Sequence, residues 1–162
     1  MGESSNLFSS KHKEGLLSAV SAGWFLILIG LIFAITPNLF GSILNFFQDF
    51  GIVTVPHTDI PLPAPKTPNI HTVVYSAVGL FSLIWGILEI VFLLLKFIAR
   101  SPVDKKAENV SNIVFWLGTS YLISATLTET TTRTTWFLFW TEILMLIGVT
   151  LIVRALILAI RR

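Results

Sequence analysis

The feature that most limits the possible folds is a long apolar run at residues 72–98, TVVYSAVGLFSLIWGILEIVFLLLKFI. Glu89 is the only charged residue in this run before Lys96, which lies near its end. The hydrocarbon core of a bilayer is about 30 Å thick and an α-helix rises about 1.5 Å per residue, so about 20 apolar residues cross it. Backbone polar groups in lipid must pair within their own segment, so the run is predicted to be a membrane-spanning helix.

Three further apolar runs, at residues 16–36, 110–128 and 135–160, extend this pattern along the chain. The chain has 162 residues, of which 54% are hydrophobic and only 12% charged, whereas soluble domains are about 25% charged. We therefore predict an all-α integral membrane protein, with one four-helix transmembrane bundle over residues 16–160 after a polar N-terminal segment, 1–15. The absence of cysteine excludes disulfides and thiolate metal sites.

Residues 37–71 form the longest connection and have two parts. In residues 37–53, apolar and polar side chains fall on opposite sides of a helical wheel, which predicts an amphipathic segment too short to span. It would either lie at the membrane surface or cap the end of the bundle. Residues 54–71 hold five of the seven prolines, which favours an extended segment that is either a spacer or a docking strand.

Basic residues predict the orientation, because they are enriched on the cytoplasmic side of a membrane. With four spans, nine of the eleven bases fall on the side of the termini and of the link between the second and third spans: Lys11, Lys13, Lys96, Arg100, Lys105, Lys106, Arg154, Arg161 and Arg162. Both termini are therefore predicted to be cytoplasmic, and residues 37–71 to lie outside. Tyr75, Trp136 and Trp140 are then expected near the outer interface, where amphipathic rings concentrate.

Small residues recur seven positions apart in every predicted span. Such a spacing keeps one helix face toward a partner, and small residues allow helix backbones in a membrane to approach closely. We expect this face to pack helices together through six glycines: Gly23, Gly30, Gly79, Gly86, Gly118 and Gly148.

Three charged residues lie inside the predicted spans, where a charge is costly and usually has a partner or a role. Glu89 and Arg154 fall at similar depths and could form an ion pair, or Arg154 could extend to the inner interface. Glu142 falls level with Tyr121, which could donate a hydrogen bond to it. The functional alternative is a proton or ion path that uses Glu89 and Glu142.

The sequence contains no phosphate-binding loop, nucleophile elbow or HExxH motif. We expect no catalytic residues, cofactor, metal ligands or nucleic-acid partner; His57, Asp59 and His71 lack a typical metal-binding spacing. The best-supported hypothesis is a non-catalytic accessory or structural subunit of a multi-subunit membrane protein complex, whose partners are the lipid bilayer and other subunits or copies of itself. The alternative is a small oligomeric transporter or channel that uses Glu89, Glu142 and Arg154.

Overall fold

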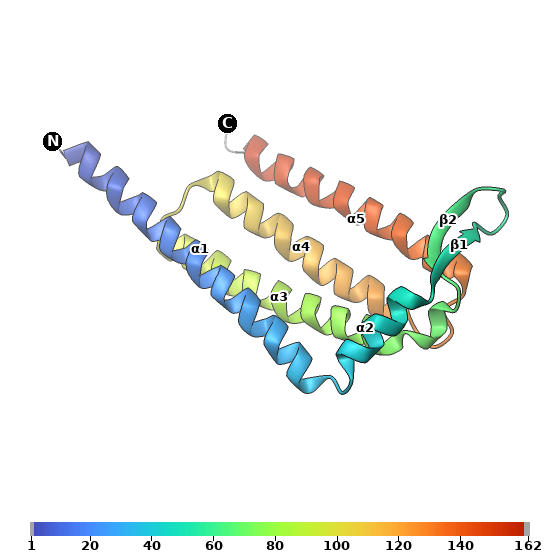
Figure 1. Ribbon diagram of the computed structural model, residues 1–162. Coiled ribbons are helices and arrows are strands. Elements are labelled where there is room, and N and C mark those ends of the chain that lie inside the picture. The colour runs from blue at the N-terminus through green and yellow to red at the C-terminus, as the bar shows by residue number, and fades with distance from the viewer. Residues whose placement is uncertain (1, 161–162) are drawn as a thin grey trace.

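Four long helices run alternately up and down in a computed structural model, which describes the backbone of residues 2–160 and the side chains of residues 15 and 18–160 (Figure 1). They are α1 (Gly2–Ile35), α3 (Thr72–Ile98), α4 (Val103–Thr126) and α5 (Arg133–Ile160). Each packs chiefly against the next, α1 on α3, α3 on α4 and α4 on α5. The start of α1 and the end of α5 therefore lie at the same end of the molecule.

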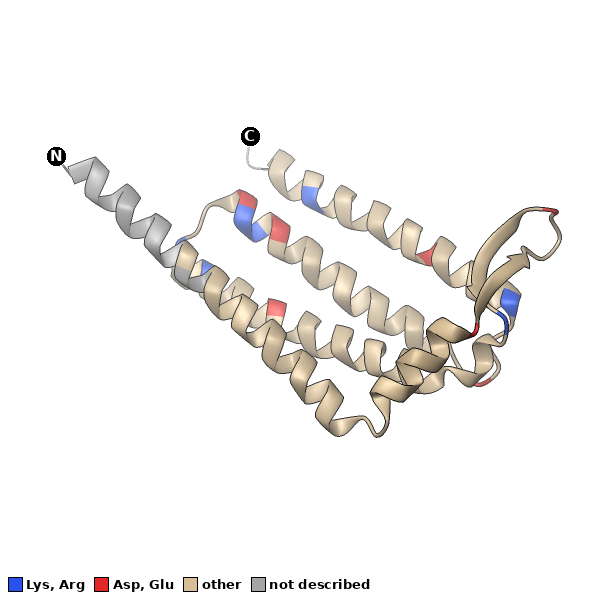
Figure 2. Cartoon of the chain, viewed as in Figure 1, with Lys and Arg blue, Asp and Glu red and all other residues tan. Residues whose placement is uncertain are grey.

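Three of these helices are long and apolar enough to cross a membrane, with candidate spans at Ser18–Ile35, Thr72–Ile98 and Arg133–Ile160. The second coincides with the predicted run, whereas α1 begins at Gly2 and so includes most of the polar segment 1–15. The helix α4 begins at Val103 rather than at 110, and its first two turns carry four charged side chains. Figure 2 shows that charge gathers at the two ends of the helices and is sparse between them.

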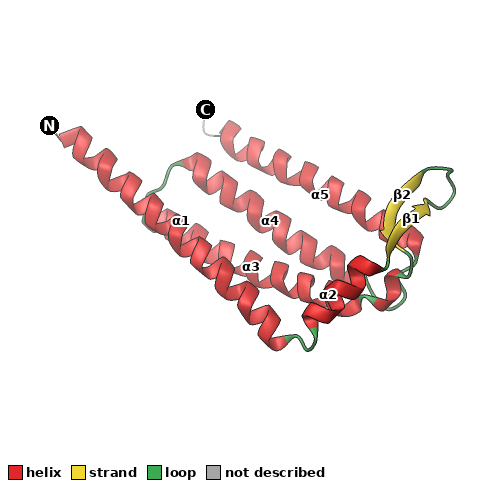
Figure 3. Cartoon of the chain, in the orientation of Figure 1, coloured by secondary structure: helices red, strands yellow, loops and turns green. Residues whose placement is uncertain are grey.

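The connection between α1 and α3 contains a short helix, α2 (Leu39–Gln48), two strands, β1 (Phe50–Thr54) and β2 (Pro61–Pro65), and a 3-10 turn, η1 (Pro68–Ile70) (Figure 3). The strands pair antiparallel, from Phe50 opposite Pro65 to Thr54 opposite Pro61. The all-α prediction missed this small sheet because prolines normally argue against a strand. Here the prolines occupy alternate positions of β2, so Leu62 and Ala64 retain their N–H groups. Alternate N–H groups of a strand point to the same side, so the prolines remove donors from one edge of β2 only.

An aromatic cluster lies beneath α2 and the hairpin. Tyr75 and Trp136 are each 4% exposed, and the ring centroid of Phe46, from α2, lies 6.1 and 6.0 Å from theirs. Tyr75 and Trp136 are therefore covered by the chain itself, whereas Trp140 is 50% exposed. One face of α2 caps the helix ends, while Phe40 and Phe47 on the other are both 67% exposed.

Two serines of α4 bond to its neighbours. The Ser111 hydroxyl donates to the Thr150 carbonyl of α5 at 3.1 Å, and the Ser120 hydroxyl donates to the Gly79 carbonyl of α3 at 2.9 Å. The most polar of the four helices therefore lies between two others, which satisfies hydroxyls that lipid could not.

Replacing Ser111 or Ser120 by alanine is expected to lower the free energy of unfolding by about 0.6 kcal/mol, the average for interhelical hydrogen bonds in membrane proteins. Ser124→Ala is the matched control, because its hydroxyl is exposed and bonds only to Tyr121 of its own helix. Denaturant unfolding of the purified protein in mild detergent would measure all three. Equal stability of the Ser111, Ser120 and Ser124 variants would contradict the prediction.

Candidate functional site

A polar cavity of about 350 Å³ lies between α1, α3 and α4. We call it the Glu89 cavity, after the carboxylate that α3 contributes to it. The first helix supplies Ser18 and Ser21, and the link before α4 supplies Ser101. Other lining side chains come from α3 and α4: Phe92, Lys96, Lys105, Glu108 and Asn112.

Helical spacing explains why these residues face the same cavity. Ser18 and Ser21 are three apart on α1, and Glu89 and Lys96 are seven apart on α3. Residues separated by three, four or seven positions share one helix face. The same spacing, three and then four, relates Lys105, Glu108 and Asn112 on α4. Three helices therefore turn their polar faces toward one space, as polar groups inside membrane proteins usually do.

Glu89 is only 6% exposed, and its main partner is Asn109 of α4. The Asn109 side-chain amide donates to the Glu89 carboxylate and also to the Glu89 backbone carbonyl, the latter at 2.8 Å. Asn109 is itself fully buried. Asn109 was not predicted because only charged residues within the spans were considered. A carboxamide at the start of an apolar run could have indicated a partner for Glu89.

The partners expected for the charged residues are not those that the structure shows. Among the described residues, the only contacts within 4 Å between a basic and an acidic side chain are His71–Asp49 and Lys105–Glu108, so Glu89 and Arg154 are not joined. Arg154 is exposed on α5. Tyr121 is 70% exposed and makes no hydrogen bond to Glu142 in the described part of the chain. Glu142 is half-buried, with one carboxylate oxygen that has no hydrogen-bond partner there.

The six predicted packing glycines divide into two groups. A Cβ atom at Gly79 would lie 3.2 Å from Ile123, and one at Gly86 or Gly118 would overlap Leu117 or Leu146. These three glycines therefore lie where α3 meets α4 and α4 meets α5. At the other three, a Cβ atom would meet nothing within 4 Å, so they face open space: Gly23, Gly30 and Gly148.

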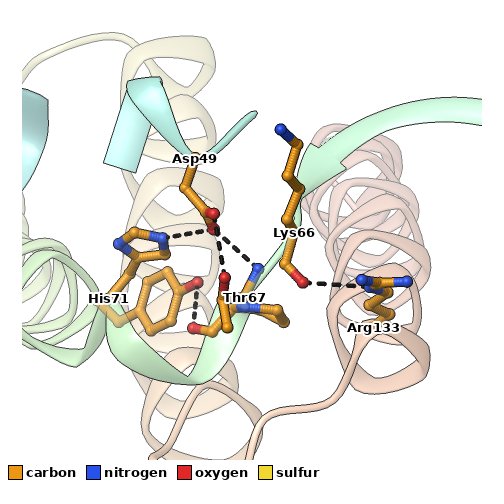
Figure 4. Close-up of polar contacts among 7 residues, drawn as sticks. Asp49, Lys66, Thr67, His71 and Arg133 are labelled. Atoms are coloured by element: carbon orange, nitrogen blue, oxygen red, sulfur yellow. Dashed lines mark hydrogen bonds and ion pairs between the residues drawn. The ribbon is translucent and has the colours of Figure 1, made fainter. Parts of the chain in front are cut away.

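A second polar cluster lies at the opposite end of the helices, around Asp49 (Figure 4). The Asp49 carboxylate accepts hydrogen bonds from the Thr67 backbone N–H at 2.8 Å, from the Thr67 hydroxyl at 3.1 Å and from His71 Nε2 at 2.9 Å. Arg133 of α5 donates from Nε to the Lys66 carbonyl at 3.2 Å. The cluster joins α2, the end of the hairpin, the start of α3 and the start of α5.

Burial alone would raise the pKa of the Asp49 carboxyl, but the hydrogen bonds from His71 and Thr67 lower it more, so this pKa lies below its ordinary value of 3.8. The His71 side chain is almost fully buried. The carboxylate thus stays ionised over the physiological range and joins the end of α2 to the start of α3 through His71.

The described residues contain no group of three His, Cys, Asp or Glu side chains that could hold a metal ion. His71 bonds to Asp49, whereas His57 and Asp59, the other possible metal ligands of this loop, are exposed in the hairpin turn. Comparison with known proteins finds no family model that matches the chain, no curated protein of similar sequence and no solved structure of similar fold.

Proposed function

We propose that this chain is a non-catalytic accessory or structural subunit of a multi-subunit membrane protein complex. It is an integral, multi-pass protein on this proposal, with four transmembrane helices and both termini in the cytoplasm. The partners are the bilayer and other membrane subunits or copies of the chain itself.

Two observations support α4 as a fourth span. The helix lies alongside α3 and α5 over most of their length (Figure 1), and its charged side chains are confined to the end near the chain termini. The apolar remainder, from residue 113 onward, is interrupted by no charged side chain before Glu129. Four spans also place the termini together, on the side that holds most of the basic residues.

The open faces of the two outermost helices carry the subunit proposal. The helices α1 and α5 form the two edges of the layer. Within the chain, only 11% of the apolar stretch of α1 and 6% of that of α5 are buried. Gly23, Gly30 and Gly148 lie on these helices with nothing beside them. Contact with lipid gives no reason for a glycine, whereas small residues such as glycine let two helices in a membrane approach closely.

We expect Gly23→Leu and Gly30→Leu, combined in one variant, to release the chain from its complex without unfolding it. The added side chains would occupy space that is empty in the isolated chain and that a partner helix would fill. The measurement is extraction from the native membrane in mild detergent, sizing of the particle and identification of co-purifying chains by mass spectrometry. The wild-type chain should migrate with a stoichiometric set of partners.

A matched control replaces two exposed leucines of the same helix, Leu26 and Leu31, by valine, which leaves a lipid-facing surface equally apolar. This control should retain every partner. A wild-type chain that elutes as a monomer from its native membrane would contradict the subunit proposal.

One observation favours a second candidate function, a small oligomeric transporter or channel that uses Glu89, Glu142 and Arg154. Glu89 borders a polar cavity instead of being sealed against a basic partner, as in proteins that move ions. Ion or proton flux through reconstituted wild-type protein, abolished by Glu89→Gln, would favour this function. Absence of flux from a correctly folded homo-oligomer would exclude it.

A further inference from the structure

A negative side chain, Glu89, and a positive one, Lys96, lie apart from each other along the Glu89 cavity. Glu89 and Lys96 lie on the same face of α3, two helical turns apart, which corresponds to about 10 Å along the helix axis. Lys96 is the nearer of the two to the inner end of α3 and is half-buried, whereas Glu89 is almost fully buried. No ion pair within 4 Å joins either to another side chain in the described part of the chain.

The other two charged residues that the described part of the chain contributes to the cavity, Lys105 and Glu108, pair with each other. Lys105 Nζ lies 3.4 Å from Glu108 Oε2, and both side chains are about half exposed. The cavity thus presents one buried carboxylate and one ammonium group that, among the described residues, have no direct counter-ion. Neutral donors and acceptors lie around them, among them Ser18, Ser21 and Asn112.

We infer that the Glu89 cavity binds a small zwitterion, with its primary ammonium group against Glu89 and its anionic group against Lys96. A ligand of this class neutralises both charges at once, whereas a simple cation would leave Lys96 without a counter-ion and a simple anion would leave Glu89 without one. Three N–H donors on a primary ammonium also match the carboxylate, carboxamide and hydroxyl acceptors nearby. The cavity volume, about 350 Å³, falls in the range of small-molecule sites.

Ligands of this chemistry have two sources, the phosphoethanolamine headgroup of a membrane lipid and a free amino-bearing zwitterion. Such a site does not depend on the subunit proposal, because a subunit and a transporter could each carry it. Loss of the partners in the extraction experiment would therefore leave zwitterion binding intact.

The test is a titration of the purified full-length protein in detergent with short-chain lipids, with binding measured by native mass spectrometry. The probes are dihexanoyl phosphatidylethanolamine, dihexanoyl phosphatidylglycerol, which lacks the ammonium group, and dihexanoyl phosphatidylcholine, whose ammonium cannot donate. We expect the ethanolamine lipid to bind at least tenfold more tightly than the other two. O-phosphoethanolamine without acyl chains should compete if the natural ligand is a free zwitterion, and fail to compete if it is a lipid.

Variants separate the two ends of the site. Glu89→Gln, which keeps the side-chain volume, should abolish the preference for the ethanolamine lipid over the glycerol lipid. Lys96→Gln should weaken both lipids, because each carries a phosphate. Glu129→Gln is the control, since that carboxylate is exposed in the turn between α4 and α5 and does not line the cavity.

Equal binding of the three lipids to the wild-type protein would overturn the inference. So would an unchanged preference in Glu89→Gln protein. Unfolding curves of each variant establish that it is folded. If Glu89→Gln protein proves unstable, weaker lipid binding by Lys96→Gln protein tests the same site, because Lys96 is only half-buried.

Discussion

Replacement of Gly86 by leucine is expected to destabilise the protein strongly, because Gly86 lies where α3 and α4 pack together. A Cβ atom at Gly86 would lie 2.5 Å from Leu117 Cδ2 and 3.2 Å from the Leu117 backbone nitrogen. The Leu117 side chain can rotate, but its backbone nitrogen can move away only if α3 and α4 separate. These two helices share the largest contact in the molecule, and overpacking of such a site costs about 1–3 kcal/mol or more.

The measurement is denaturant unfolding of Gly86→Leu protein in detergent, monitored by tryptophan fluorescence. Trp85 is buried in the core near this contact and Trp116 packs against that core. Gly30→Leu is the matched control, since the same residue enters an apolar helix where nothing lies within 4 Å. The control should change the free energy of unfolding by no more than about 0.5 kcal/mol. Similar stabilities for the two variants would mean that α3 and α4 do not pack at Gly86.

The contrast between these glycines shows what the sequence could and could not predict. Spacing by seven occurs in all four helices, and it identified Gly79, Gly86 and Gly118, which lie in helix contacts. It equally identified Gly23 and Gly30, which face open space. Periodicity marks a face of a helix, but which helices are neighbours, and how each is rotated, depends on packing between segments distant in sequence.

The same distinction applies to the polar residues. The apolar run at 72–98 predicted α3 correctly to the residue, because length and hydropathy suffice to define a span. The partner of Glu89 could not be predicted from depth alone, which favoured Arg154. The rotation of α4 that places Leu117 against Gly86 also brings Asn109 to Glu89, and no local pattern in the sequence specifies that rotation.

The connection between α1 and α3 was only partly predictable for a different reason. The proline content predicted an extended segment over 54–71, and residues 61–65 within it form β2, which pairs with Phe50–Thr54. Beside this strand pair lies Asp49. This residue accepts bonds from Thr67 and His71, and its backbone carbonyl accepts one from the Lys66 N–H at 3.1 Å. Contacts between residues some twenty positions apart thus join the end of α2 to the segment that follows β2, and the sequence shows only that suitable donors and acceptors exist.

The second large effect is expected from Asp49→Ala, which should lower the free energy of unfolding by about 2–4 kcal/mol. The substitution removes an ionised acceptor and leaves the buried His71 ring without its partner, and hydrogen bonds to charged groups contribute about 1.5–3 kcal/mol each. Asp59→Ala is the matched control, because that carboxylate is exposed in the turn of the hairpin and its loss should be nearly neutral.

The stabilisation by Asp49 should also depend on pH in a defined direction. Because the pKa of its carboxyl is lower in the folded protein than the ordinary 3.8, the folded state favours the ionised form. The contribution is therefore complete above about pH 5 and is lost as the pH falls below 3.8 toward the folded-state pKa. Unfolding curves measured between pH 3 and 6 should show this loss in wild-type and Asp59→Ala protein. Asp49→Asn protein should lack that component, and an identical acid dependence in Asp49→Asn would show that another carboxylate is responsible.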